Sequence, residues 1–178
     1  MSSYCDIARG HPWHGPFHDS EHGFPVRDES ALFERLVLEI NQAGLSWLTV
    51  LKKRTGLRAA FDNFDIDTVA AYGEAERARL LADAGIIRNR LKVAAVIENA
   101  RRLQAMRAEC GGFAAWLDSH HPLSREDWVR LFKRNFKFTG GEITNEFLMG
   151  TGYLPGAHGP DCPVYADVAK LNPPWMRA

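Results

Sequence analysis

The sequence has little that would place the protein in a membrane or outside the cell. No stretch approaches the roughly 20 consecutive apolar residues of a membrane-spanning helix. The first residues, MSSYCDIARGHPWHG, lack the apolar core of a secretory signal. Only 3 of the 178 residues are cysteine, and this small, odd number argues against a disulfide framework. We therefore expect a cytoplasmic protein whose cysteines are core residues or metal ligands.

A net charge is also missing, because 22 Lys and Arg residues balance 22 Asp and Glu residues. Many nucleic-acid-binding domains are strongly basic, and this chain is not. The charges are nevertheless unevenly distributed: residues 1–40 hold 3 basic and 7 acidic side chains, whereas residues 51–110 hold 12 and 8. A polyanionic partner is expected to contact this middle segment. The hydrophobic fraction of 46% is enough for the core of one domain.

The spacing of apolar residues predicts helices, and alternation with a period of two is nowhere sustained. From Leu32 to Ile40 the apolar side chains fall on one helical face, with Asp28 or Ser30 as the N-cap. The Gly- and Pro-rich segments 5–27 and 150–178 are expected to be irregular. The fold class is therefore all-α. Ser46 is expected to cap a helix over residues 47–54, and Asp67 is expected to cap a short helix that runs through Ala71. Further helices are expected over residues 75–84, before Gly85, and from about residue 89 onward. The last two are expected after Ser124 and over residues 142–149.

Two cysteines and two histidines near the chain ends have the composition of a tetrahedral zinc site. Cys5 and His18 lie in the first irregular segment, and His158 and Cys162 have the H-x3-C spacing common in such sites. A shared metal would join segments that packing alone does not hold in place. The spacing alone leaves open that these are unrelated thiols and surface histidines. Cys110 has no histidine beside it and is interpreted as structural.

A carboxylate and a tryptophan lie close together in the sequence at residues 39–47. On a helical wheel Glu39 is about 20° from Leu32, at the edge of the apolar face. A carboxylate facing a core is unfavourable unless it is paired or used. With Trp47, just past Gly44, it can form a pocket for a flat, hydrogen-bonding ring. The pattern also fits a structural carboxylate paired with an arginine and a tryptophan in the core.

A turn between two predicted helices has the features of a phosphate-binding site. The first helix ends at Gly85, the chain turns through two isoleucines, and the next helix begins with Arg88 and Arg90. Backbone N–H groups before a helix N-terminus can hold a phosphate. Lys52 and Lys53 add positive charge from a separate segment. Corners of this kind are common, so this feature alone is not specific.

Together these segments resemble the 3-methyladenine DNA glycosylase I family of the helix-hairpin-helix superfamily. The order and spacing of the motifs hold from about Cys5 to Tyr165, nearly the whole chain. The matching segments are DSEHGFP at 19–25, Glu39 with QAGLSW at 42–47 and LKKR at 51–54, DAGIIR at 83–88, FKFTG at 136–140, and the pair His158 and Cys162.

The resemblance implies a single two-lobed helical domain over residues 1–178, with a DNA-binding hairpin at about 80–92. It implies a structural zinc ion that joins the N- and C-terminal segments. It also implies a monomeric, monofunctional enzyme that hydrolyses the N-glycosidic bond of alkylated purines in double-stranded DNA, with 3-methyladenine as the expected lesion. The implied residues are Glu39 as the catalytic residue, Trp47 in the base pocket, Gln42, Gly44 and Leu45 in the gap left by the flipped nucleotide, Lys52, Lys53, Gly85, Arg88 and Arg90 on DNA, and Cys5, His18, His158 and Cys162 on zinc.

The chain departs from the family pattern at four pocket positions. Tryptophan is usual at Ile7 and His22, an aromatic residue at His14, and tyrosine at Phe17. All four are expected to line the base pocket, so the exact lesion is left open. The alternatives are a diverged member that binds damaged DNA without excision, and one that acts on a different or bulkier lesion. A zinc-containing interaction domain without a DNA role is a third hypothesis, and it predicts no salt-dependent DNA binding.

The implied chemistry is hydrolysis of a bond that alkylation has already weakened. The damaged nucleotide must first be rotated out of the duplex. Glu39 is expected to accept hydrogen bonds from the cationic base while Trp47 stacks on it, and water is the expected nucleophile. No lysine occurs between Gly10 and Val50, so nothing near the predicted pocket indicates Schiff-base chemistry.

Overall fold

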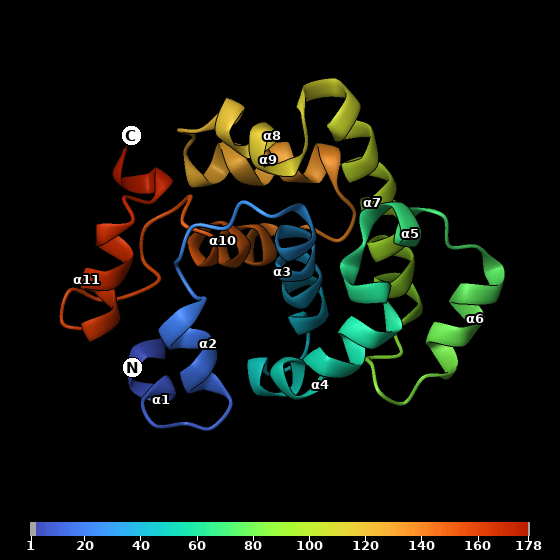
Figure 1. Ribbon diagram of the computed structural model, residues 1–178, viewed down its shortest axis with the longest axis horizontal. Coiled ribbons are helices and arrows are strands. Elements are labelled where there is room, and N and C mark those ends of the chain that lie inside the picture. The colour runs from blue at the N-terminus through green and yellow to red at the C-terminus, as the bar shows by residue number, and fades with distance from the viewer. Residues whose placement is uncertain (1–2, 178) are drawn as a thin grey trace.

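A computed structural model, which describes residues 3–177, has an all-α architecture without β-strands in that range, as the sequence predicted (Figure 1). None of the helices in the described range is long and apolar enough to cross a membrane. The α-helices are α1 (Tyr4–Ala8), α2 (His14–Ser20), α3 (Glu29–Gln42), α4 (Trp47–Ala60), α5 (Ile66–Ala70), α6 (Glu74–Ala82), α7 (Arg90–Cys110), α8 (Phe113–His120), α9 (Arg125–Asn135), α10 (Gly141–Gly150) and α11 (Pro163–Lys170), and the 3-10 helices are η1 (Asp62–Phe64) and η2 (Pro174–Met176).

The central element is α3, which packs against α4, α7, α8 and α10 (Figure 1). Asp28 begins it, since its side chain accepts a hydrogen bond from the Ala31 N–H at 2.9 Å. Ten consecutive residues of α3, from Leu32 to Asn41, are buried. A helix enclosed in this way is a rigid support, and it carries Glu39 near its C-terminal end.

The N- and C-terminal segments are more regular than the sequence predicted. The segment expected to be irregular at 5–27 contains α1 and α2, and the tail contains α11. The prediction failed because these helices are short and show little aliphatic periodicity. In α2, for example, the buried side chains include His14 and His18 beside Phe17. In Figure 1 the two chain ends lie on the same side of the molecule, with α1 and α2 close to α11.

Several helix boundaries differ from the predictions. Helix α4 continues past Arg54 and through Gly56 to Ala60. Helix α5 begins two residues earlier than expected, because Asp65 and not Asp67 caps it by accepting the Thr68 N–H at 2.8 Å. Helix α6 ends at Ala82, before Gly85, because Asp83 already has an extended backbone. The short helix α8 was not predicted at all.

An ion-pair network fixes the N-terminal segment to α3 and α4. Arg54 donates to both carboxylate oxygens of Glu21 at 2.7 Å, and it also pairs with Glu34. Arg58 donates to Glu34 at 2.6 Å. Because Glu34 and Arg54 are largely buried, these charge-assisted bonds hold the segment before α3 more firmly than surface pairs would.

Candidate functional site

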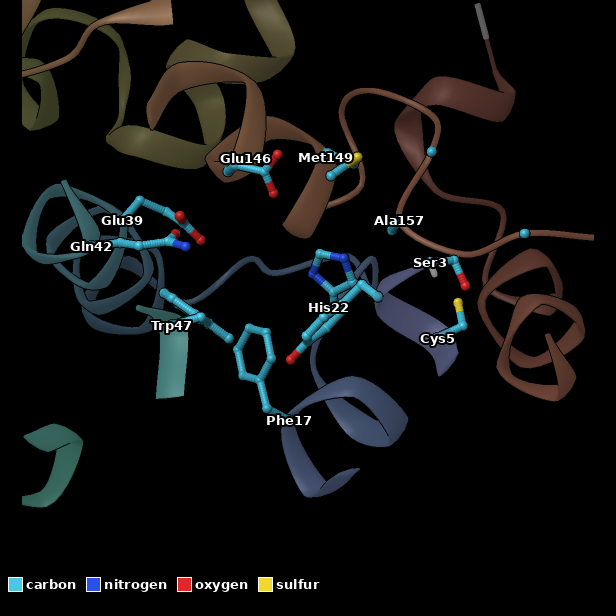
Figure 2. Close-up of a pocket in the computed structure, with 13 residues that line it drawn as sticks. Ser3, Cys5, Phe17, His22, Glu39, Gln42, Trp47, Glu146, Met149 and Ala157 are labelled. Atoms are coloured by element: carbon cyan, nitrogen blue, oxygen red, sulfur yellow. The ribbon is translucent and has the colours of Figure 1, made fainter. Parts of the chain in front are cut away.

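A cavity of about 370 Å³ opens between the N-terminal helices, α3, α4 and α10 (Figure 2). Its wall combines aromatic rings with two carboxylates and an amide. The lining residues are Ser3, Tyr4, Cys5, Phe17, His22, Glu39, Gln42, Trp47, Glu146, Met149, Gly156, Ala157 and Gly159. A concave, mostly apolar site with a few convergent polar groups is typical of small-ligand binding.

Glu39 points into this cavity from α3 (Figure 2) and is only 7% exposed. Burial raises the pKa of its carboxyl to about 8, while Arg35 lowers and Glu146 raises that pKa. Arg35 lies one turn away but donates to the backbone oxygens of Glu21 at 3.3 Å and Gly150 at 3.0 Å. Within residues 3–177 no Lys, Arg or His group lies within 4.0 Å of the Glu39 carboxyl, although the charge of Arg35 acts on it from further away.

Aromatic side chains with mutually tilted rings line a slot beside Glu39. The centroid of the Phe17 ring lies 5.1 Å from the centroid of the Trp47 ring and 5.8 Å from that of the His22 ring. The Arg35 guanidinium packs over Phe17 at 4.7 Å from the ring centroid. Ser46 positions Trp47 at the start of α4, because its hydroxyl accepts the Thr49 N–H. The cavity is therefore shaped for a planar ring with a polar edge.

Two of the four divergent positions line the cavity and two do not. Phe17 and His22 are in its wall, whereas Ile7 is 49% exposed on α1 and His14 is buried outside the wall. Tyr4 lines the cavity instead, and its hydroxyl lies 3.3 Å from His14 Nδ1. Burial raises the pKa of Tyr4 to about 12, so it is a neutral hydroxyl in the wall.

The lining residues that sequence analysis missed include Tyr4 on α1 and Glu146 and Met149 on α10. The two residues on α10 are three positions apart and therefore share a helix face. This spacing was the only available signal, and it did not indicate which cavity the face would meet.

A groove of about 590 Å³ adjoins the cavity, between the loop at 42–45 and the first half of α10. Glu39, Gln42 and Glu146 line both spaces. Gly44 has a φ of +78°, a left-handed conformation that favours glycine. Leu45 is 41% exposed at the tip of the loop.

The loop at 42–45 is attached to α7 by Lys92. The ammonium of this residue donates to the carbonyl oxygens of Asn41 at 2.8 Å and Ala43 at 2.6 Å. Lys92 is 5% exposed, and burial lowers its pKa. Lys92 therefore holds the loop and is not free to contact a phosphate.

The turn between α6 and α7 presents arginines to solvent, while several of its backbone N–H groups are bonded within the turn. The Gly85 N–H donates to Asp83 Oδ1 at 2.7 Å, and Asn89 caps α7 by accepting the N–H groups of Leu91 and Lys92 at 3.0 Å. Gly56 of α4 packs directly on the carbonyl oxygen of Gly85, with no room for a side chain.

The basic residues at this turn have different surroundings. Arg88, Arg90 and Lys52 are exposed and, among the described residues, have no carboxylate within 4.0 Å. Lys53 was expected to contact DNA, yet its ammonium donates to the Ala84 carbonyl at 2.7 Å and supports the turn.

The four predicted metal ligands come together in the structure. The Sγ atoms of Cys5 and Cys162 and the ring nitrogens of His18 and His158 all lie within 4.8 Å of one another. His18 Nε2 is 3.1 Å from His158 Nδ1, and Cys162 Sγ is 3.6 Å from each of these nitrogens. The group could therefore hold a metal ion.

The remaining ring nitrogens of the two histidines have partners of their own. His18 Nδ1 lies 2.7 Å from Asp19 Oδ1, and His158 Nε2 lies 2.7 Å from the His22 carbonyl oxygen. Such outer contacts orient histidine ligands at metal sites. They leave one nitrogen of each ring free for a metal.

The chain resembles characterised proteins over most of its length. The sequence profile of the methyladenine glycosylase family matches residues 8–130. DNA-3-methyladenine glycosylase 1 of Escherichia coli is 39% identical, over 84% of this chain and 90% of that protein. The DNA-3-methyladenine glycosylase of Haemophilus influenzae is 35% identical, over 85% and 95%.

A solved structure of 3-methyladenine DNA glycosylase I from Staphylococcus aureus, on 3-methyladenine recognition, superimposes with a TM-score of 0.80. It is 28% identical and covers 90% of this chain and 95% of that one. The superposition agrees with the helical fold. The chain belongs to the methyladenine glycosylase family.

Proposed function

We propose that the protein is a base-excision repair enzyme that hydrolyses the N-glycosidic bond of alkylated purines in DNA, with 3-methyladenine as its principal lesion. The observation that carries this proposal is the buried, unpaired Glu39 carboxylate beside the slot formed by Phe17 and Trp47. A cationic planar base satisfies both features at once. The names of the relatives support the same substrate.

The proposed reaction begins with rotation of the damaged nucleotide into the cavity. Alkylated bases pair weakly, so they are extruded more easily than normal bases. Trp47 and Phe17 then enclose the ring, and Glu39 accepts hydrogen bonds from its polar edge. The exposed Leu45 fills the gap in the duplex, in a loop that Lys92 holds against α7.

Bond cleavage then transfers charge from the base to the sugar. The bond between C1′ and N9 breaks, both electrons go to N9, and the base leaves as a neutral molecule. The positive charge passes to the deoxyribose, and water adds to C1′ and loses a proton. No lysine lines the cavity, which supports hydrolysis without a Schiff base.

The turn between α6 and α7 is the proposed contact with the DNA backbone. The exposed side chains of Arg88 and Arg90 beside the start of α7 favour phosphate. Lys52 adds charge from α4. These contacts read no base, so their role is to position the double-stranded substrate. We propose that the protein acts as a single-domain monomer.

The Cys and His group is proposed to hold a structural zinc ion. Tetrahedral zinc has bonds of about 2.3 Å to sulfur and about 2.0–2.1 Å to nitrogen. With these bond lengths, two nitrogen ligands lie about 3.3 Å apart, and a nitrogen and a sulfur ligand lie about 3.5 Å apart. The distances of 3.1 Å and 3.6 Å between these atoms fit this geometry. Four protein ligands close the site, so the ion would join the chain ends and take no part in catalysis.

Incubation with duplex DNA treated with a methylating agent tests the proposed function. We expect free 3-methyladenine in the supernatant, identified by chromatography. Release of only another modified base would favour the hypothesis of a different lesion, to which Phe17 and His22 would adapt the pocket. Binding to abasic or methylated duplex without release would favour the hypothesis of a diverged DNA-binding protein.

A further inference from the structure

A second carboxylate, that of Glu146, faces the same cavity from a different helix. Figure 2 shows it pointing into the cavity from α10, while Glu39 enters from α3. Within residues 3–177 its hydrogen-bond partner is the neighbouring Asn145 amide at 3.5 Å, and no Lys, Arg or His lies within 4.0 Å. A half-buried carboxylate without a cation is unfavourable in the empty site.

The electrostatic effect of Glu146 reaches Glu39. Its negative charge raises the pKa of Glu39, and burial raises the pKa of Glu146 itself. Two carboxylates in one enclosed space repel each other. A cation held between them would stabilise both, whereas a neutral purine would not.

Glu146 is also at the boundary between the cavity and the groove, since it lines both. A flipped nucleotide that places its base in the cavity must leave its sugar and phosphates in the groove. The carboxylate of Glu146 is therefore close to the junction of base and deoxyribose. Glu142, one turn earlier on α10, lines only the groove and pairs with Arg125 at 3.2 Å.

We propose that Glu146 is a second charge-selecting residue of the site, whose carboxylate stabilises the positive charge of the alkylated nucleotide at the junction of base and sugar. This inference rests on the proposed function. As the C1′–N9 bond breaks, the charge moves from the ring to the deoxyribose. A carboxylate at the junction stays close to the charge before and after this transfer, whereas Glu39 faces the base.

The test compares Glu146→Gln with Glu126→Gln, which removes the same charge from an exposed position on α9 that lines neither the cavity nor the groove. The first measurement is single-turnover release of 3-methyladenine from methylated duplex. A charge-assisted contact of a half-buried group corresponds to roughly a tenfold change in rate. We expect Glu146→Gln to slow release about tenfold and Glu126→Gln to leave the rate unchanged, with both melting temperatures near that of the wild type.

The second measurement separates selection of positive charge from a general effect on DNA binding. Affinity is measured for two duplexes, one with a cationic pyrrolidine abasic analogue and one with the neutral tetrahydrofuran analogue. Glu146→Gln should reduce the ratio of the two affinities about tenfold, and Glu126→Gln should preserve it. An unchanged ratio, or wild-type release by Glu146→Gln, would overturn the inference. If the wild type released no base, the proposed function would fail, and the affinity ratio would still decide the role of Glu146.

Discussion

Replacing Glu39 with glutamine keeps the shape of the side chain and removes its charge. The carboxylate is 7% exposed and has no ion pair among the described residues, so water screens it little. A hydrogen bond to a charged group contributes about 1.5–3 kcal/mol. The pKa of Glu39 in the free protein is about 8, so release is compared at a pH above this value, where the carboxyl is ionised. If this bond is fully formed in the transition state, the release of 3-methyladenine should slow about tenfold to a hundredfold.

The assay is single-turnover release of 3-methyladenine from methylated duplex, together with the affinity for abasic DNA. Abasic DNA places no base in the cavity, so its affinity should be the same for Glu39→Gln and the wild type. Unchanged release with a lowered melting temperature would refute the reasoning and make Glu39 a structural residue.

The pH dependence of stability gives an independent check on the same variant. Burial raises the pKa of Glu39 from its ordinary value of 4.5 to about 8. Between these values the folded protein retains a proton that the unfolded chain has released. The stability from this group is therefore present below about pH 4.5 and is lost as the pH rises to about 8. Glu39→Gln should lack this loss, so the melting temperature of the variant should exceed that of the wild type most at pH 8 and above. An identical pH dependence would contradict the raised pKa.

Three further predictions concern the DNA contact, the metal and the loop. Replacing Arg88 and Arg90 with alanine should weaken binding to damaged and undamaged duplex alike. The slope of log affinity against log salt concentration should fall by the amount expected for about two lost phosphate contacts; a loss confined to damaged DNA would contradict this. Metal analysis should find one zinc per chain, and Cys162→Ser or a chelator should lower the melting temperature, whereas an unchanged melting temperature would rule out the structural role. Lys92→Met should slow base release several-fold, because the carbonyl groups of Asn41 and Ala43 lose their shared donor; wild-type release would show that the loop holds its position without Lys92.

The elements that the sequence predicted correctly are those with local physical signals. Asp28, Ser46 and Ser124 each cap the helix that follows, because their side chains accept an N–H from its first turn. The apolar periodicity of α3 was long enough to define its face, and it placed Glu39 at the edge of that face. The spacing of Cys5, His18, His158 and Cys162 also indicated a group that the structure brings together.

The wall of the cavity could not be predicted in the same way, because it is assembled from distant segments. Tyr4 lies in a five-residue helix with one buried residue, Ala8, so no periodicity marks it. Glu146 shares a face of α10 with Met149, but only the packing of α10 against α3 brings that face to Glu39. Ile7 was misplaced because motif order alone does not define which side of a short helix is buried.

The most direct test of the account measures the base and the DNA strand in one reaction. Methylated duplex is incubated with the wild-type protein, free 3-methyladenine is quantified, and the strand is examined before and after alkaline treatment. We predict one abasic site for each base released, with strands that break only after alkali. Intact methylated bases after prolonged incubation, despite measurable binding, would contradict the assignment of this cavity to base excision.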